Sequence, residues 1–142
     1  MCCNYNKKNT VELRKKMKAA GGTMRFWKAY DRYGGWYALP VVLRPICYDT
    51  GFDILPGEIV SNRKEIGHDI WDCGDGIYRG IHVNLNTRKG IEEVNDWKRV
   101  APKVVVVCVT AHVDDLVCVG YRGDAVFMKV KLSRKSWKKA LK

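Results

Sequence analysis

Near the beginning of the sequence, apolar residues recur at helical spacing: Leu13, Met17 and Ala20. Asn9 and Glu12 precede this repeat at the spacing of a capping box, whose two side chains bond to backbone N–H groups at a helix start. Gly21-Gly22 can supply the left-handed conformation in which helices commonly end. The pattern therefore predicts a helix from Asn9 to residue 20, preceded by a flexible basic arm over residues 1–8.

Aromatic and β-branched residues then predict three extended segments, over residues 23–30, 36–43 and 57–61. Gly34-Gly35 is a hairpin-type turn signal between the first two segments. Pro40 cannot donate a backbone hydrogen bond, so we expect it at a sheet edge or a bulge. Residues 45–56 have prolines and few periodic apolar positions, which predicts an irregular connection with room for one short strand.

Residues 76–84 predict a central strand, and we expect the rest of the chain to be organised around it. Asn86 or Thr87 can cap a following helix that extends to Trp97. The apolar face of this helix comprises Ile91, Val94 and Trp97. Gly90 weakens the helix, because glycine has a low helix propensity.

Residues 103–110 contain five valines and a cysteine almost without interruption. Such a β-branched run predicts a central strand buried on both faces. Residues 125–132 alternate instead, which predicts one half-buried strand. One face of that strand comprises Val126, Met128, Val130 and Leu132, and the other comprises Phe127, Lys129 and Lys131. Ser133 can cap a last helix, over residues 133–142.

The predicted order is helix, strands, helix, strands, helix, without regular alternation of the two types. That order favours the α+β class, with a mixed or mostly antiparallel sheet and two to three helices packed on it. A length of 142 residues suits a single domain spanning residues 1–142.

The formal net charge of +11 indicates an anionic partner, which we expect to be a nucleic acid, a nucleotide or an acidic protein. Hydrophobic residues make up 46% of the chain, which is enough for a core and argues against general disorder. The six cysteines include no Cys-x-x-Cys pair, so we expect a reduced, cytoplasmic protein without a metal site. The longest apolar run is too short to cross a membrane, and we expect no membrane partner.

The clearest electrostatic feature is the C-terminal segment, because residues 125–142 contain no acidic residue. Its cations are Lys129, Lys131, Arg134, Lys135, Lys138, Lys139 and Lys142. On a helix that follows Ser133, the cations from Arg134 onward form a broad basic face opposite Trp137 and Leu141. This face suits contact with phosphates, and a solvated terminal helix is the alternative.

Gly74, Gly76 and Arg79 form a second candidate anion-binding site. Glycines allow a backbone to approach a ligand closely, and a helix beginning at Asn86-Thr87 would direct N–H groups towards an anion. The glycine spacing matches neither the dinucleotide fingerprint nor the P-loop. A tight turn without a ligand is therefore the alternative.

His82 and Tyr78 are the candidates for catalysis. They are four residues apart, so a single strand would place both side chains on one face. The alternative is that His82 has a structural role, with its ring hydrogen-bonded within the sheet. No acid–base partner can be assigned from the sequence, because nothing selects among the candidate carboxylates. These are Glu58, Glu65, Asp69, Asp72 and Asp75.

Four blocks carry a resemblance across most of the chain: MRFWKAY at 24–30, SNRK at 61–64, GIHV at 80–83 and DAVFMKVKL at 124–132. As a set and in this order they resemble a family of small bacteriophage and prophage proteins that has no assigned activity. The resemblance implies a phage-type protein that acts in the host cytoplasm.

Gly76-Ile77-Tyr78, followed by GIHV, a capped helix and a valine-rich strand, is remotely similar to ADP-ribosyltransferase-like folds. In those folds a comparable strand lies beside the NAD site. The chain has no clear His-Tyr-Glu or Arg-Ser-Glu catalytic set. The similarity implies a transferase-like enzyme centred on His82, with NAD as cofactor. Because the catalytic set is missing, this enzyme is the alternative to a non-catalytic binding protein.

Three functional hypotheses follow from these observations. The first is a non-catalytic binding or host-interaction module that recognises an anionic partner and needs no cofactor. The second is the ADP-ribosyltransferase-like enzyme acting on a host target. The third is a virion or assembly component.

Overall fold

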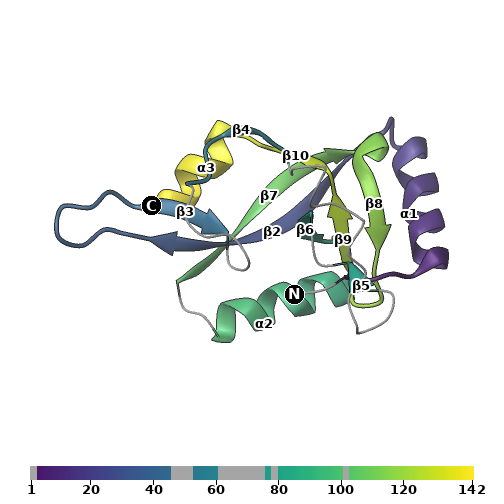
Figure 1. The fold of residues 1–142 in the computed structure, drawn as a ribbon, viewed down its shortest axis with the longest axis horizontal. Helices are drawn as coiled ribbons and strands as arrows, with labels where there is room; N and C mark the ends of the chain where they lie inside the picture. The colour runs from purple at the N-terminus through teal and green to yellow at the C-terminus, as the bar shows by residue number, and fades with distance from the viewer. Residues whose placement is uncertain (1–2, 46–52, 61–75, 78–79, 101–102) are drawn as a thin grey trace.

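The computed structural model describes residues 3–45, 53–60, 76–77, 80–100 and 103–142 (Figure 1). The helices are α1 (Lys7–Ala19), α2 (Arg88–Val100) and α3 (Arg134–Leu141). The strands are β1 (Cys3–Asn4), β2 (Thr23–Tyr33), β3 (Val42–Pro45), β4 (Gly57–Val60), β5 (Gly76–Ile77), β6 (Ile81–Asn84), β7 (Val104–His112), β8 (Leu116–Val119), β9 (Asp124–Phe127) and β10 (Lys129–Leu132). A short 3₁₀ helix, η2 (Val113–Asp115), precedes β8.

Eight of the described strands form one antiparallel sheet in the order β4-β10-β7-β2-β6-β9-β8, with β3 also paired to β2. β1 and β5 pair separately as a two-stranded sheet. The longest pairing joins β2 to β7, from Thr23 opposite His112 to Asp31 opposite Val104. This arrangement confirms the predicted α+β class with a mostly antiparallel sheet and three helices packed on it.

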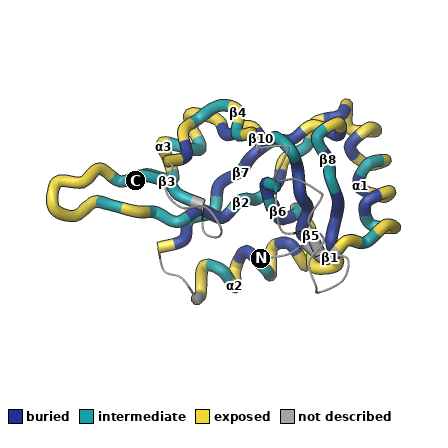
Figure 2. Tube along the Cα trace, viewed as in Figure 1, coloured by how far each residue is buried: buried dark blue, intermediate teal, exposed yellow. Residues whose placement is uncertain are grey.

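The helices cover both faces of the sheet. Alternation along β2 places Phe26 and Tyr30 on the face of the main core, where Met17 of α1 and Leu141 of α3 pack. Ala29 lies on the opposite face, and α2 packs there against β2, β6 and β7. Figure 2 shows the resulting pattern, with dark blue strands in the middle and exposed yellow positions along the outer sides of the helices.

α1 begins earlier than the sequence pattern suggests. Asn6, not Asn9, is the N-cap, and its side-chain Oδ1 accepts a hydrogen bond from the Asn9 backbone N–H at 2.9 Å. Cys3–Asn4 pairs with β5, so the predicted flexible arm over residues 1–8 is wrong for its described part. The predicted glycine ending is confirmed, because Gly22 has a φ of 95° and its N–H donates to the Met17 carbonyl at 2.7 Å.

β7 lies between β10 and β2, as expected for a central strand. Val107 and Val109 are buried in the main core. On the α2 side, however, Val106 and Cys108 are only half-buried. The prediction of burial on both faces is therefore wrong for part of the strand, because α2 covers only part of that face.

The predicted strand over residues 76–84 is two separate strands. β5 ends at Ile77 and pairs with β1, whereas β6 begins at Ile81 and pairs with β9. β6 also meets β2 where Trp27 lies opposite Asn84, so it is an interior strand of the large sheet. Only the second half of the predicted strand therefore has the central position expected for the whole.

The alternating segment over residues 125–132 is also two strands, β9 and β10, separated at Met128. The Met128 backbone N–H donates outside the sheet ladder to the Asp115 carbonyl at 2.8 Å. This interruption changes the alternation, so Phe127 shares the main core with Val130, whereas Val126 packs with Cys118 in a second cluster. The predicted division of the segment into two faces is therefore wrong.

β2 and β3 form a long hairpin that projects from the body of the molecule (Figure 1). Residues 36–41 form its tip and contain no strand, so the extended segment predicted over 36–43 is wrong for most of its length. Gly34 has a φ of 100°, and a Cβ atom there would lie 2.1 Å from the Pro40 carbonyl oxygen. Glycine is thus required where the two strands approach each other.

Candidate functional site

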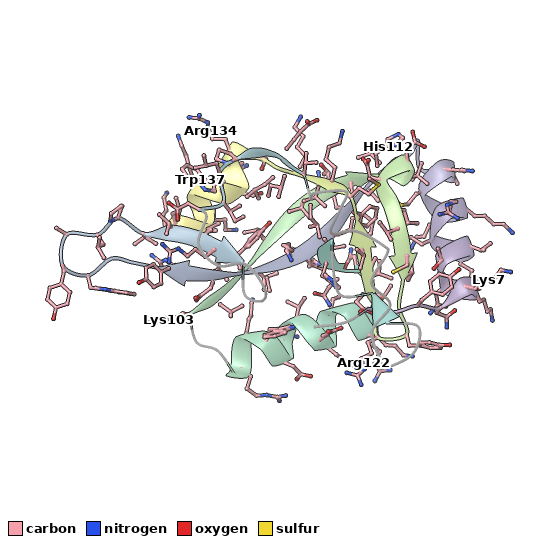
Figure 3. The ribbon with its side chains drawn as sticks, viewed as in Figure 1. Lys7, Lys103, His112, Arg122, Arg134 and Trp137 are labelled. Carbon is pink, nitrogen blue, oxygen red and sulfur yellow. The ribbon has the colours of Figure 1, made fainter. Side chains whose placement is uncertain are left out.

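The exposed face of α3 concentrates positive charge. Trp137, Ala140 and Leu141 pack against the main core, which turns the opposite side of the helix outward (Figure 3). The exposed residues on that side include five cations: Arg134, Lys135, Lys138, Lys139 and Lys142. α3 itself contains no acidic residue. The structure therefore presents the basic face that the sequence predicts.

Local interactions fix where α3 begins. Ser133 is its N-cap, and the Ser133 hydroxyl oxygen accepts a hydrogen bond from the Ser136 backbone N–H at 3.1 Å. This is the cap expected from the sequence. β10 ends at Leu132, which is fully buried, so the helix starts directly from the sheet.

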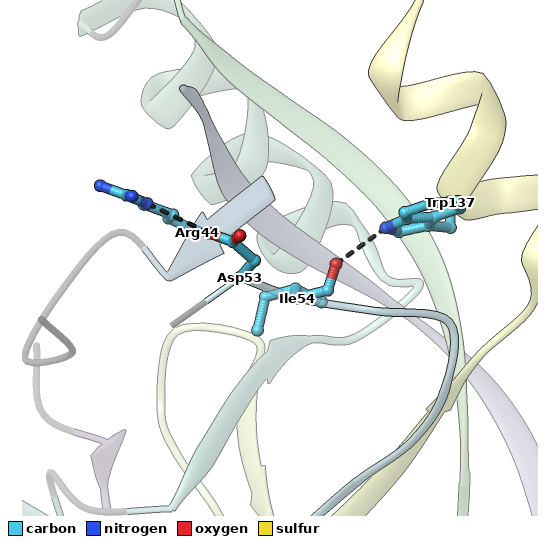
Figure 4. A network of polar contacts seen from close by, with 4 residues as sticks. All are labelled: Arg44, Asp53, Ile54 and Trp137. Atoms are coloured by element: carbon cyan, nitrogen blue, oxygen red, sulfur yellow. Dashed lines mark hydrogen bonds and ion pairs between the residues drawn. The ribbon is translucent and has the colours of Figure 1, made fainter. Parts of the chain in front are cut away.

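Two further hydrogen bonds hold α3 against the neighbouring segments. The Trp137 indole N–H donates to the Ile54 carbonyl oxygen at 2.8 Å, as Figure 4 shows. The Arg32 guanidinium donates to the Leu141 carbonyl at 2.8 Å, which joins the C-terminal end of α3 to β2. The basic face is therefore held in a defined position beside the β2–β3 hairpin.

Lys129 and Lys131 do not belong to this face. Val130 and Leu132 of the same strand point into the main core, so the two lysines point to the other face of the sheet. Lys129 Nζ also lies 3.7 Å from Glu58 Oε1 on the adjacent strand β4. The seven predicted cations are thus divided between two surfaces.

The glycine-rich turn is only partly described. Gly74, Tyr78 and Arg79 lie outside the described residues. Gly76 is in β5, opposite Asn4 of β1, and so belongs to a strand pairing.

His82 lies in β6, which begins at Ile81, whereas β5 ends at Ile77. Tyr78 lies outside the described residues, so its expected position on the same face as His82 stays a prediction. His82 lies opposite Val126 of β9 and is half-buried.

The structure brings together two carboxyl groups that the sequence reasoning did not consider, Glu93 of α2 and Asp124 of β9. Burial is the main cause that raises the pKa of Glu93, and the charge of Asp124 raises it further. Arg122 and a hydrogen bond with Asn84 act in the opposite direction. Glu93 Oε2 is buried and accepts no hydrogen bond from any described residue.

Two glycines, Gly90 of α2 and Gly123 before β9, allow the backbones of these two segments to approach each other closely. A Cβ atom at Gly90 would lie 2.0 Å from the Leu85 carbonyl oxygen and 2.9 Å from the Gly123 carbonyl oxygen. α2 therefore contacts the turn before β9 backbone to backbone. Gly90, predicted only to weaken the helix, is the residue that permits this contact. Ile91, predicted to lie on the buried face, is instead exposed.

The chain contained one signal for Glu93. Gly90, Val94 and Trp97 form the inward-facing side of α2, and Glu93 lies within that helical repeat. Asp124 gave no such signal, because its position depends on the pairing of β9 with β6, which places it opposite Asn84.

Three further properties of the described residues bear on the expected chemistry. They contain no group of three or more His, Cys, Asp or Glu side chains that could bind a metal ion. Cys108 and Cys118 form no disulfide. No helix among them is long and apolar enough to span a membrane.

Comparison with known proteins adds no family assignment: no protein-family model, curated protein or solved structure matches this chain. The functional argument therefore depends on the geometry of the molecule.

Proposed function

We propose that this protein is a non-catalytic nucleic-acid-binding protein that contacts phosphates with the basic face of α3. The observation that carries the proposal is the exposure of five cations along one short helix that has no carboxylate of its own. These cations define the basic face as Arg134, Lys135, Lys138, Lys139 and Lys142. The net charge of +11 would add long-range attraction to a polyanion.

The spacing of the cations favours a repeating anion over a single nucleotide. With a helical rise of about 1.5 Å per residue, Arg134 to Lys142 spans about 12 Å. One strand of a nucleic acid duplex carries a phosphate about every 3.4 Å along the helix axis, so the face can reach about three phosphates. Cations that bind one phosphate would instead converge on a point.

α1 provides a control for charge alone. Its cations are Lys7, Lys8, Arg14, Lys15, Lys16 and Lys18, with Glu12 as its one acidic residue. α1 lies beside β8, at the end of the molecule away from α3 (Figure 1). A specific α3 site and a general effect of net charge therefore predict different results when each helix is changed.

The test compares two triple variants of equal charge change. Lys135, Lys138 and Lys139 are replaced by glutamate in one variant, and Lys15, Lys16 and Lys18 in the other. Binding to a fluorescent DNA duplex is measured by anisotropy over a range of salt concentrations. The α3 variant should lower the slope of log K against log salt by about 2 to 3, because each lost phosphate contact removes about 0.9. The α1 variant should retain most of the slope.

Equal losses in the two variants would show that net charge, and not the α3 face, determines binding. Unchanged binding in the α3 variant would exclude this face as the site. All six positions are exposed, so each substitution should change the free energy of unfolding by only about 0.5 kcal/mol. The melting temperatures therefore show whether a loss of binding has a structural cause.

The enzyme hypothesis keeps one supporting observation, the raised pKa of Glu93 beside Asp124, near the strand that carries His82. A transferase-like enzyme would be stabilised by NAD, by about 2.7 kcal/mol at one hundred times the dissociation constant. Thermal melting with NAD and mass spectrometry of ADP-ribose transfer to host lysate proteins would test this alternative. Transfer that is lost with Glu93→Gln would favour it over the binding function.

A further inference from the structure

The tip of the β2–β3 hairpin is largely exposed (Figure 2), and it contains several large apolar residues. Within residues 33–39, the exposed large side chains are Tyr33, Trp36, Tyr37 and Leu39. Tyr37 is 95% exposed, the highest value among the exposed large apolar residues of the described chain. A core or strand-pairing role does not explain such a residue, so a ligand is the simplest reason for the group.

Two of the aromatic rings are held in place by neighbouring cations. The Arg44 guanidinium lies 4.1 Å from the centre of the Tyr33 ring, and Lys103 Nζ lies 4.7 Å from the centre of the Trp36 ring. The Tyr33 and Trp36 rings pack edge to face with their centres 5.1 Å apart. The tip thus combines oriented rings with positive charge, although Arg44 also lies 3.5 Å from Asp53.

The backbone of the tip holds Tyr37 outward. The Leu39 N–H donates to the Trp36 carbonyl at 2.9 Å, which closes a tight turn. Its two central residues, Tyr37 and Ala38, have φ values of 49° and 62°, a region that normally requires glycine or asparagine. Strain of this kind is concentrated at binding sites, where it sets a side chain in advance.

We propose that this aromatic tip, formed by Tyr33, Trp36 and Tyr37, stacks on the bases of a single-stranded nucleic acid whose phosphates α3 contacts. The inference rests on the proposed function and deepens it, because it names the form of the ligand. Base stacking on exposed aromatic rings combined with cations is the recurrent way to bind single strands. In a duplex the base faces are already stacked, so an exposed ring gains little there.

The hairpin and the basic face are adjacent, which allows one strand to contact both. Arg32, in the hairpin strand β2, bonds to the carbonyl of Leu141 at the end of α3, and β3 itself contacts α3. Arg44 and Lys103 continue the positive charge towards the rings. A strand lying along α3 would therefore lead to the hairpin that carries the aromatic tip.

The experiment measures the affinities of a single-stranded DNA oligonucleotide and of the matched duplex for several variants. Tyr37→Ala and Trp36→Ala should each weaken single-strand binding about tenfold or more, as expected for the loss of one stacked base. Duplex binding should change less than twofold. Tyr121→Ala is the control, because Tyr121 is 59% exposed in the turn between β8 and β9.

Two further variants of Tyr37 separate binding from stability. Tyr37→Phe keeps the ring and should retain affinity for the single strand. Tyr37→Gly removes the ring but suits the positive φ, so it should raise the melting temperature and still weaken single-strand binding. A purely structural role for Tyr37 predicts no loss of binding in the Tyr37→Gly variant, and that result would overturn the proposal.

The remaining outcomes distinguish this inference from the proposed function. If the tip variants bind the single strand normally while the α3 variant does not, the stacking role is wrong and the phosphate site stands. If the tip variants lose binding to the single strand while the α3 variant binds it normally, the proposed function is wrong. Equal losses for single strand and duplex, or Trp36-dependent binding to anionic lipid vesicles, would overturn the single-strand assignment.

Discussion

α2 and α3 are both amphipathic helices packed on the large sheet, yet their outer surfaces differ in charge. On α2 the cations alternate with carboxylates, and Arg88 pairs with Glu92 and Arg99 with Asp96. On α3 no residue can neutralise its neighbours within the helix, because none is acidic. The comparison shows that similar packing leaves different charge on the exposed side, which is partly paired on α2 and uncompensated within α3.

The inner surfaces of the two helices differ as well. α3 packs through a tryptophan, an alanine and a leucine, and its indole N–H bonds to the chain at Ile54. α2 packs through Gly90 and Val94 and carries the half-buried carboxyl of Glu93 inward. α3 thus packs on the core through apolar side chains, whereas α2 brings an ionisable group into the protein.

The largest expected effect is on β7, the strand that both helices contact. Val107→Asp would place an unpaired charge at a site that is 4% exposed, at a cost of several kcal/mol against a typical total stability of about 5–15 kcal/mol. We expect the variant to be largely unfolded by circular dichroism. Val60→Asp, at a 66% exposed position of β4, should remain folded. A folded Val107→Asp protein would contradict the central position of β7.

The next effect concerns the close contact of α2. In an unconstrained helix, Gly→Ala stabilises by about 1 kcal/mol. At Gly90 the new methyl group would instead meet the Leu85 carbonyl at 2.0 Å, so we expect destabilisation of about 1–3 kcal/mol in urea denaturation. Asn95→Ala, at an exposed position of the same helix, provides the matched control. A stabilised Gly90→Ala variant would show that α2 lies farther from the turn.

A smaller effect is expected from the indole hydrogen bond of α3. Trp137→Phe keeps an aromatic ring but removes the donor to Ile54, which should cost about 1–2 kcal/mol in free energy of unfolding. Binding to the DNA duplex should be retained if the helix keeps its position. Loss of binding with unchanged stability would mean that Trp137 contacts the ligand directly.

The smallest expected effect is a pH-dependent change in stability caused by Glu93 on the inward surface of α2. The pKa of Glu93 is raised above its ordinary value of 4.5, so the folded protein binds more protons than the unfolded chain as pH rises from that value. Glu93 therefore lowers stability progressively over this range, and the penalty is fully present above its folded pKa. Glu93→Gln should raise the melting temperature at pH 7 and change it little at pH 4. An equal shift at both pH values would exclude ionisation as the cause.

Local signals in the sequence were sufficient for the end of α1, for the starts of α2 and α3 and for the basic face, although not for the start of α1. Ser133 caps α3, and Thr87 accepts a hydrogen bond from the Gly90 N–H at 3.2 Å at the start of α2. Gly21-Gly22 ends the first helix, and β4 lies where a strand was expected. These features depend on residues a few positions apart, so their hydrogen-bonding and apolar patterns are legible in the chain.

The tertiary structure alone decided which distant segments meet. The interruption at Met128 changes the sheet face that Val126 occupies. The Met128 N–H donates there to the carbonyl of Asp115, which lies in another element. The pairing of β9 with β6, together with the close approach of Gly90, brings Asp124 near Glu93. The bond from Arg32 to Leu141 likewise places the aromatic hairpin beside the basic helix. The sequence determined the charge of α3 and the pattern of its apolar residues, but these contacts depend on backbone register and close packing between remote residues, which no local pattern encodes.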